Sequence, residues 1–331
     1  MTGPRIVVLA GGVGGAKFVR GLRAHCLDTW PDGHGGTTAD VTVVANTGDD
    51  LWLAGLRVTP DLDSLMYALA GVNDEQRGWG RAGESERVSA ELTAYGVGWP
   101  WFTLGDLDLG THIARTSLLR DGLPLSTVTA RLTARWPLGV RLIPATDDEV
   151  ETHVVVEEDG ARRELHFEEW WVRTRAALPA LGFVQRGVET AGPAAGVLEA
   201  LAAADVVLLA PSNPVVSIGT ILGIPGIREA VTGTTAPLIG ISPIIGGAVV
   251  RGMADACLSA IGVETSAAAV ARHYGARSAG GLLDGWLVDE VDAAAVPLLS
   301  ETGVRAAAVP LWMTDDGASA AIASAALALA R

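Results

Sequence analysis

The stretch "RIVVLAGGVGGAKFVRGL", residues 5–22, places four glycines and a lysine directly after an apolar run. The run 6–9 is typical of a buried strand, and residues 16–22 are typical of a helix. Glycines between a strand and a helix let backbone N–H groups approach an anion at the helix N-terminus. The segment therefore predicts a phosphate-binding loop, with a tight strand-to-helix turn that binds nothing as the alternative. The candidate phosphate-binding residues are Gly11, Gly12, Gly14, Gly15 and Lys17.

Two well-known glycine motifs do not fit this stretch. In the dinucleotide fingerprint G-x-G-x-x-G, Lys17 would stand where the third glycine belongs. In the nucleoside-triphosphate P-loop, a glycine precedes the lysine and Ser or Thr follows it, whereas here the neighbours are Ala16 and Phe18. What remains is the physics that both motifs share, an anion held at a helix N-terminus.

Composition restricts the classes of function. The chain has 331 residues and a net charge of −14, so no basic surface for nucleic acid is expected. Its two cysteines, Cys26 and Cys257, form no C-x-x-C pair, which excludes a thiolate zinc cluster and a disulfide framework and fits a reducing cytoplasm. No signal peptide or membrane-spanning run is recognisable, so we expect a cytoplasmic protein without membrane contact.

Apolar strand-like runs alternate with helical patterns along the chain, which predicts a Rossmann-like, doubly wound, mostly parallel α/β sheet. We expect a single domain over 1–331, with a helical and hairpin region inserted at about 72–195. Small, polar or acidic loops follow four of the strands: "GGVGGAK", "NTGDD", "PSNP" and "SPIIGG". Ligands bind outside the carboxyl ends of such strands, so these loops predict one shared site. Side chains at one strand end offer hydrogen bonds to a nucleotide, and they are Ser212, Asn213 and Ser217.

Four carboxylates, Asp49, Asp50, Asp61 and Asp63, stand within fifteen positions. Asp61 and Asp63 could simply favour a helix dipole, but that does not explain the adjacent pair in the preceding loop. Carboxylates beside a phosphate loop are typical of a Mg²⁺ site. A further group contains Asp106, Asp108, Thr111, His112 and Arg115, and the scattered histidines disfavour zinc.

Together, "GGVGGAK", "NTGDD", "PDLDSLMYALAG", "WFTLGDLDLGTH", "PSNPVVSIGTIL" and "SPIIGG" resemble the signatures of the 2-phospho-L-lactate transferase family. The resemblance implies a Rossmann-like core, Mg²⁺, a homodimer and a role in making the deazaflavin coenzyme F-420. It implies transfer of a three-carbon acid phosphate from a guanosine-diphospho-activated donor to the deazaflavin Fo, with release of GMP. The alanine-rich, lysine-poor composition resembles that of actinobacterial members, whose unit is understood to be phosphoenolpyruvyl, giving dehydro-F-420-0. The residues themselves do not distinguish the enolpyruvyl from the lactyl donor.

The resemblance also suggests roles for individual residues. Asp49 falls where the family contacts Fo and the metal, and Asp61 lies in the neighbouring metal motif. A basic residue that contacts Fo matches Arg87, with Arg81 as the second choice, because "Glu84-Ser85-Glu86" replaces the Asp-Thr-Phe that relatives often have. As the proton acceptor we expect Asp50 or Asp63, and we expect the Ser212–Ser217 loop to hold guanosine.

Two other classes of function remain. A related family of sugar-nucleotide-binding regulatory proteins resembles the chain in its glycine loop and PSNP region, but it lacks "LGDLDLGTH". A nicotinamide dehydrogenase would need an acidic residue after the second strand, where Asn46 stands.

Overall fold

The computed structural model describes residues 3–331 and contains a central sheet of seven parallel strands. In spatial order the strands are β14 (Arg305–Ala308), β13 (Gly285–Val288), β10 (Leu238–Ile241), β9 (Val206–Leu209), β1 (Arg5–Ala10), β2 (Asp40–Ala45) and β5 (Arg141–Pro144). The strand order reverses at β1, which pairs in parallel with β2 on one side and β9 on the other. This topology confirms the predicted doubly wound α/β fold. In such folds ligands bind where the strand order reverses.

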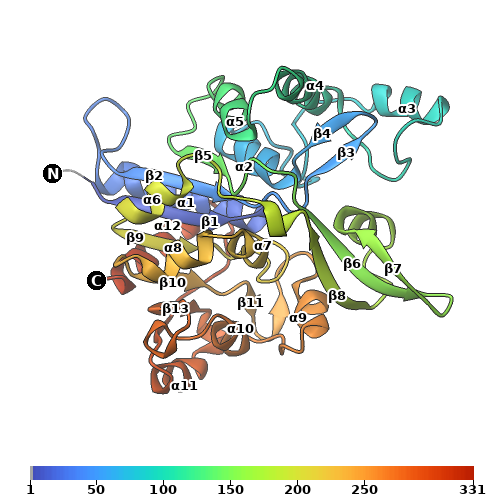
Figure 1. Cartoon of the computed structure of the whole chain (residues 1–331). Helices are drawn as coiled ribbons and strands as arrows, with labels where there is room; N and C mark the ends of the chain where they lie inside the picture. Colours follow the sequence, from blue (N-terminus) through green and yellow to red (C-terminus); the bar gives the residue numbers. More distant parts are fainter. Residues whose placement is uncertain (1–2) are drawn as a thin grey trace.

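Helices cover both faces of this sheet (Figure 1). Alternate residues of β1 point to opposite faces, so Ile6 and Val8 pack in one core while Val7 and Leu9 pack in the other. The first core contains α1 (Gly12–Thr29), α2 (Pro60–Ala70), α5 (Leu125–Thr133) and α12 (Asp316–Leu329). The second contains α6 (Val197–Ala203), α7 (Ile218–Gly223), α8 (Ile227–Gly233), α10 (Ala267–Tyr274) and α11 (Ala295–Glu301).

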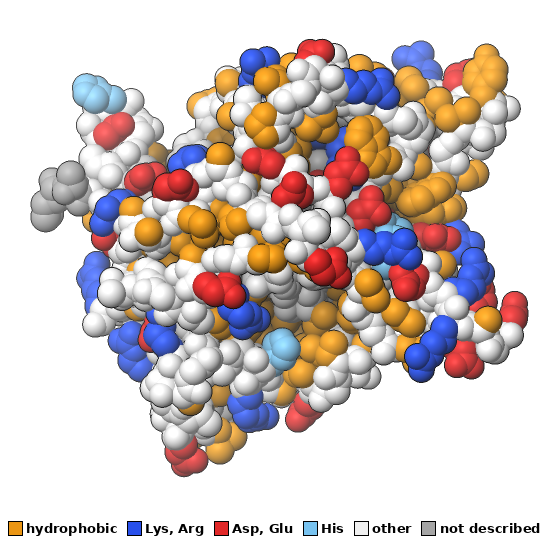
Figure 2. Space-filling view, viewed as in Figure 1, with side chains coloured by type: hydrophobic (Ala, Val, Ile, Leu, Met, Phe, Trp, Pro, Cys, Tyr) orange, Lys and Arg blue, Asp and Glu red, His pale blue; other side chains and the backbone are white. Residues whose placement is uncertain are grey.

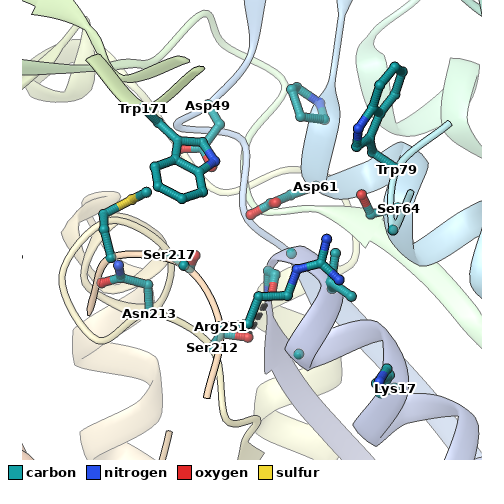
Figure 3. A pocket seen from close by; sticks show the side chains of 18 of the residues that line it. Lys17, Asp49, Asp61, Ser64, Trp79, Trp171, Ser212, Asn213, Ser217 and Arg251 are labelled. Carbon is teal, nitrogen blue, oxygen red and sulfur yellow. Dashed lines mark hydrogen bonds between the residues drawn. The ribbon is translucent and has the colours of Figure 1, made fainter. Parts of the chain in front are cut away.

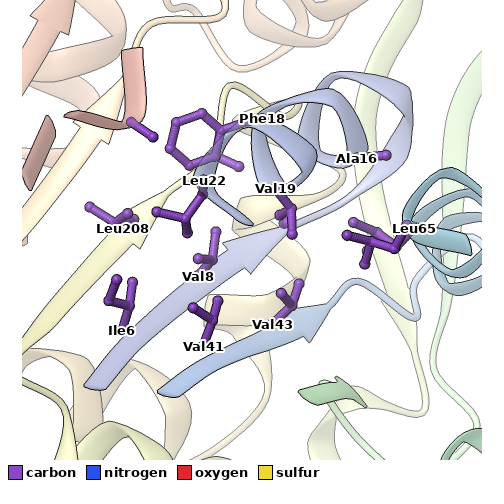
Figure 4. Packing of buried hydrophobic residues seen from close by; sticks show 14 of the residues in the cluster. Ile6, Val8, Ala16, Phe18, Val19, Leu22, Val41, Val43, Leu65 and Leu208 are labelled. Atoms are coloured by element: carbon purple, nitrogen blue, oxygen red, sulfur yellow. The ribbon is translucent and has the colours of Figure 1, made fainter. Parts of the chain in front are cut away.

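Helix α1 is fixed by packing against its neighbours, as Figure 4 shows for Phe18, Val19 and Leu22 over the strands. Gly21 lies so close to α12 that an added Cβ would stand 2.6 Å from the backbone nitrogen of Ala320 and nearer still to Ser319. The two helices can approach this closely only because Gly21 has no side chain. The position of α1 therefore depends on α12.

The remaining elements lie mainly beside the carboxyl ends of the strands. They are the hairpin of β3 (Leu51–Leu53) and β4 (Leu56–Val58), α3 (Arg87–Ala94), α4 (Asp106–Arg120), the hairpin of β11 (Ile244–Ile245) and β12 (Ala248–Val249), and α9 (Ala254–Ala260). An antiparallel sheet of β7 (Ala161–His166), β6 (Glu151–Glu158) and β8 (Ala180–Arg186) projects from the right of Figure 1. A π-helical turn (Glu169–Arg173) follows β7, and short 3₁₀ turns cover Val188–Thr190, Arg277–Ala279 and Glu290–Asp292. Strand β5 lies within 72–195, the range expected as an insertion, yet it joins the central sheet. The expected single domain with an insertion stays a prediction.

One expected boundary was wrong. We expected a loop before a helix at Ala16, but α1 begins at Gly12, so the glycines form its first turn. Glycine is a poor helix former, and tertiary packing overrides that preference here. A Cβ at Gly14 would stand 2.8 Å from the carbonyl oxygen of Pro211, and one at Gly15 would stand 2.8 Å from Ser212 Oγ. These glycines let the helix start lie directly against the PSNP loop.

None of the helices in residues 3–331 is long and apolar enough to cross a membrane. The face in Figure 2 mixes acidic and basic side chains and shows no continuous basic stripe.

Candidate functional site

A cavity of about 1040 Å³ lies at the carboxyl ends of β1, β2, β9 and β10. The four predicted strand-end loops all contribute to its wall, so the expectation that they meet is confirmed. The residues that they contribute are Gly11, Gly12, Val13, Gly14, Lys17, Asp49, Pro211, Ser212, Asn213, Ser242, Pro243 and Ile245, and Ser217 lines the cavity just after the PSNP loop. The opposite wall comes from the region 72–195 and is rich in aromatic side chains, namely Trp79, Trp101, Phe102, Phe167 and Trp171.

One buried hydroxyl, that of Ser212, hydrogen-bonds the PSNP loop to the glycine segment 11–15. Ser212 Oγ donates to the carbonyl oxygen of Gly11 at 2.7 Å and accepts from the Gly11 nitrogen at 2.9 Å. The side chain of Asn213 is also used within its loop, because its Oδ1 accepts from the Val215 nitrogen at 2.9 Å. Ser217 lines the cavity at the start of α7 and is buried. The loop is thus held rigidly against the start of α1.

Helix α1 presents an open N-terminus to this cavity. Its first turn contains no acidic residue, and Gly11 has no side chain to cap it. The Gly12 N–H at this end lowers the pKa of Asp61, although burial raises it overall. The following N–H groups and the positive end of the helix dipole remain suited to an anion such as phosphate.

Asp49 and Asp61 lie together in the middle of the site (Figure 3). Asn46 Nδ2 donates to Asp61 Oδ2 at 2.9 Å, and Asn46 Oδ1 accepts from the Gly48 nitrogen at 3.0 Å. Burial is the main reason that the pKa of Asp61 rises to about 6. Burial raises the pKa of Asp49 well above its usual range, and the charge of Asp61 adds to the effect. Asp49 Oδ1 is buried, and no described residue within 3–331 donates a hydrogen bond to it.

Asp63 belongs to a different group of side chains, in which an arginine balances the negative charge. The buried guanidinium of Arg115 donates to Asp63 Oδ1 and lies 2.9 Å from His112 Nδ1. Tyr67 donates its hydroxyl proton to Asp108 Oδ1 at 2.7 Å, and His112 Nε2 lies 3.3 Å from the same oxygen. Oxygen and nitrogen atoms of Asp63, Asp108 and His112 lie near enough to one another for a metal, but Arg115 already supplies a positive charge there. This cluster therefore needs no cation.

The other predicted residues lie outside the cavity wall. Gly15 packs behind it, and Asp50 is fully buried, with its carboxylate 3.6 Å from Arg57 Nη2. Arg87 is exposed at the start of α3, where its Nε contacts Ser85 Oγ at 3.5 Å. Arg81 is buried, with its guanidinium over the rings of Tyr67 and Trp136. Contact of either arginine with a ligand stays a prediction.

The sequence analysis missed Glu168, whose buried carboxyl lines the cavity. Burial and the charge of Asp61 raise its pKa to about 8. It also missed Trp79 and Arg251, which line the same cavity. The sequence contains little indication that these residues belong to the site, because Trp79 stands alone between glycines and Glu168 lies in the charged second arm of a predicted hairpin.

Comparisons with known proteins identify the family of the chain. The model of the family described as "2-phospho-L-lactate transferase CofD" matches residues 6–309. A Streptomyces coelicolor protein named phosphoenolpyruvate transferase is 58% identical over 326 residues, which cover 98% of each chain. A Mycolicibacterium smegmatis protein with the same name is 52% identical over 328 residues and also 98% of each chain. A solved structure from Bacillus halodurans has a TM-score of 0.62 at 18% identity, covering 99% of this chain and 100% of its own, so it shows a shared fold alone. The chain therefore belongs to the 2-phospho-L-lactate transferase CofD family.

Proposed function

We propose that this chain transfers a phosphoenolpyruvyl group from a guanosine-diphospho-activated donor to the terminal ribityl hydroxyl of Fo, releasing GMP. The observation that supports this most is the cavity itself. An open helix N-terminus and two buried carboxylates without a cationic partner, Asp49 and Asp61, share it with an aromatic wall. The names of the full-length relatives support phosphoenolpyruvate as the source of the three-carbon unit, with 2-phospholactate as the alternative.

The two walls fit the two substrates. N–H groups at the start of α1, together with Lys17, would bind the diphosphate of the donor. The Ser212–Ser217 loop would hold the guanosine, since it follows β9 at the same edge. Trp79, Trp101 and Trp171 offer flat faces for the deazaflavin rings of Fo.

The carboxylates fit a Mg²⁺ ion. Oxygen ligands suit this ion, and Asp49 and Asp61 offer buried oxygens that no described arginine or lysine neutralises. When bound, Mg²⁺ would supply positive charge to the phosphate oxygens. The chain's own Asn46 keeps Asp61 in place, because its Nδ2 donates to Asp61 Oδ2.

In the reaction, the oxygen of the Fo hydroxyl attacks the phosphorus that bears the three-carbon acid, and the bond from that phosphorus to the GMP oxygen breaks. GMP leaves with the bonding electrons, and the hydroxyl proton passes to a carboxylate. Of the two acceptors expected, Asp63 lines the cavity and Asp50 does not, so we keep Asp63 in this role. Burial raises the pKa of Asp63 although Arg115 pairs with it, which favours proton uptake, and a loose phosphoryl transition state demands little of this base.

The test measures GMP release by the purified protein with Fo, Mg²⁺ and either donor. Asp49→Asn should lower turnover about a hundredfold, because one contact to transition-state charge is worth about 3 kcal/mol. Asp106→Asn is the matched control, since Asp106 accepts from Ser85 outside the cavity wall and should keep its turnover. Normal turnover and metal dependence in Asp49→Asn would contradict the proposal. Gel filtration with light scattering tests the homodimer that we also propose.

Sugar-nucleotide binding without transfer is the alternative function. Full-length relatives at 52–58% identity that are named transferases favour catalysis instead. Tight donor binding without any GMP release in the same assay would favour the alternative.

A further inference from the structure

Arg251 links two segments of the cavity wall that are far apart in the sequence. It follows β12, while the segment 74–80 lies between α2 and α3, and both segments line the cavity. Arg251 Nη2 donates to the carbonyl oxygen of Arg77 at 3.3 Å, across a separation of 174 positions in the chain. Figure 3 shows the side chain of Arg251 together with that of Trp79, which the segment 74–80 carries. One guanidinium therefore joins the loop after β12 to the segment that contains Trp79.

Gly78 makes room for this contact. An added Cβ at Gly78 would stand 2.7 Å from Arg251 Cζ and nearer still to both terminal nitrogens of the guanidinium. Heavy atoms do not approach a Cβ this closely without displacement. Gly78 also has φ +75°, a backbone conformation that glycine adopts without strain. The guanidinium thus packs directly on the backbone of the segment 74–80, in addition to its hydrogen bond.

The segment 74–80 is arranged around the side chain of Arg77. This side chain pairs with Asp74 at 3.0 Å and with Glu84 at 2.9 Å. Its guanidinium also lies over the ring of Trp79, 4.6 Å from the ring centroid, so it covers one face of the indole. Trp79 still has 41% of its surface exposed and lines the cavity. A flat ligand can therefore stack on the face that Arg77 leaves free.

The other attachment of this segment is weaker. Glu75 pairs with Arg20 of α1 at 2.8 Å, but 70% of the Glu75 side chain is exposed, and exposed ion pairs contribute little to stability. Arg251 has no carboxylate within ion-pair distance among residues 3–331, and its contacts to the segment are with backbone atoms. Removing the guanidinium should therefore loosen the segment without leaving an unpaired charge.

We propose that Arg251 is a positioning residue: it holds the segment 74–80 in place and so presents the free face of Trp79 to the flat ring system of the acceptor. This inference rests on the proposed function for the identity of the acceptor, Fo. Its main measurement is binding of Fo, which requires no turnover. Arg251 thereby acts on the acceptor through Trp79 and not by direct contact.

The test measures the affinity for Fo by isothermal titration without donor. Arg251→Met keeps an apolar stem and removes the hydrogen-bond donors, so it should weaken Fo binding about tenfold, as expected when a stacking contact is partly lost. The KM for Fo should rise, and the KM for the donor should stay unchanged. Arg251→Lys can donate one hydrogen bond to the same carbonyl and should recover part of the affinity. Arg131→Met is the control, because Arg131 is exposed on α5 outside the cavity wall and its loss should leave Fo affinity unchanged.

Gly78→Ala tests the same contact from the other side. The new Cβ displaces the guanidinium, so this variant should also weaken Fo binding. Gly83→Ala is its matched control, since Gly83 has the same φ of +75° but no atom within 4 Å of the Cβ position. It carries the same backbone strain and should keep its Fo affinity. Adding Gly78→Ala to Arg251→Met should weaken binding little further, because both changes remove one contact.

A second double variant separates positioning from direct binding. In Trp79→Leu protein, adding Arg251→Met should have no further effect on Fo affinity. A loss that persists without Trp79, or a higher KM for the donor with an unchanged KM for Fo, would show that Arg251 binds a ligand itself and would overturn this inference. Wild-type Fo affinity in Arg251→Met would also overturn it and leave the transfer reaction intact. Weaker Fo binding in Arg251→Met that depends on Trp79, in a wild-type protein that releases no GMP, would support this inference and contradict the proposed function.

Discussion

Gly11→Ala is the most informative single change in the glycine segment. Gly11 has φ −151° and ψ 154°, an extended conformation that alanine adopts without strain. The new Cβ would stand 2.8 Å from Ser217 Cβ and even closer to Asp61 Oδ2, whereas ordinary contacts begin at 3.4 Å. The alanine therefore pushes directly against a proposed cation ligand.

The size of the effect follows from what holds Asp61. To relieve the overlap, the Asp61 carboxylate must move, which disturbs the hydrogen bond that Asn46 Nδ2 donates to Asp61 Oδ2 at 2.9 Å. A hydrogen bond to a charged group is worth about 1.5–3 kcal/mol. Because 1.4 kcal/mol corresponds to a factor of ten, Gly11→Ala should weaken Mn²⁺ binding about tenfold to a hundredfold. Overpacking should also lower the free energy of unfolding by about 1–3 kcal/mol.

Gly12→Ala is the control for stability. Gly12 has φ +63°, where alanine is strained by about 1–2 kcal/mol, but its Cβ would meet only Asp61 Oδ1 at an ordinary 3.5 Å. Urea unfolding should show similar destabilisation in both variants, while isothermal titration with Mn²⁺ should show a large loss of affinity only in Gly11→Ala. Equal cation affinities in the two variants would refute the steric reasoning.

The other predictions concern the packing of α1, the PSNP loop and the thiols. Gly21→Ala should lower the free energy of unfolding by about 2 kcal/mol, because the new Cβ overlaps α12. Gly110→Ala lies in open space on α4 and should raise the free energy of unfolding by up to about 1 kcal/mol. Urea denaturation that shifts both variants in the same direction would contradict this reasoning. Asn213→Ala should raise the KM for the donor and leave that for Fo unchanged; the reverse result would exchange the two halves of the site. Burial raises the pKa of Cys26 and Cys257 to about 12, so iodoacetamide at pH 8 should label neither thiol until urea unfolds the chain, as mass spectrometry can check.

Much of the fold could be predicted because the central strands are continuous apolar runs. The strand expected at 6–9 lies within β1, and the helix expected at 16–22 lies within α1. The strands of the β3–β4 hairpin have only three residues each, too few for alternation to be recognisable. Sequence analysis also missed β8, which completes the antiparallel sheet by pairing with β6.

The site could be predicted only where its residues stand close together in the sequence. Asp49 and Asp61 were found because they are clustered beside a recognisable helix start, and both line the cavity. Glu168 lines the same cavity only through the tertiary placement of β7, which no local sequence pattern indicates. Tertiary placement likewise separates Asp50 from Asp63, because both are buried but only Asp63 lines the cavity.

The contact between α1 and α12 has a consequence for how the protein is made. A ribosome synthesises β1 and α1 early, yet β1 pairs with β9 and α1 packs through Gly21 against Ser319 of α12. Contacts between such distant segments form slowly, and chaperones commonly protect the apolar surface that waits for them. The N-terminus of α1, which faces the cavity, is therefore among the first segments translated and among the last to reach its final packing. A nascent chain stalled before α12 should still be unable to recognise a phosphate, although every residue of the glycine segment has already emerged.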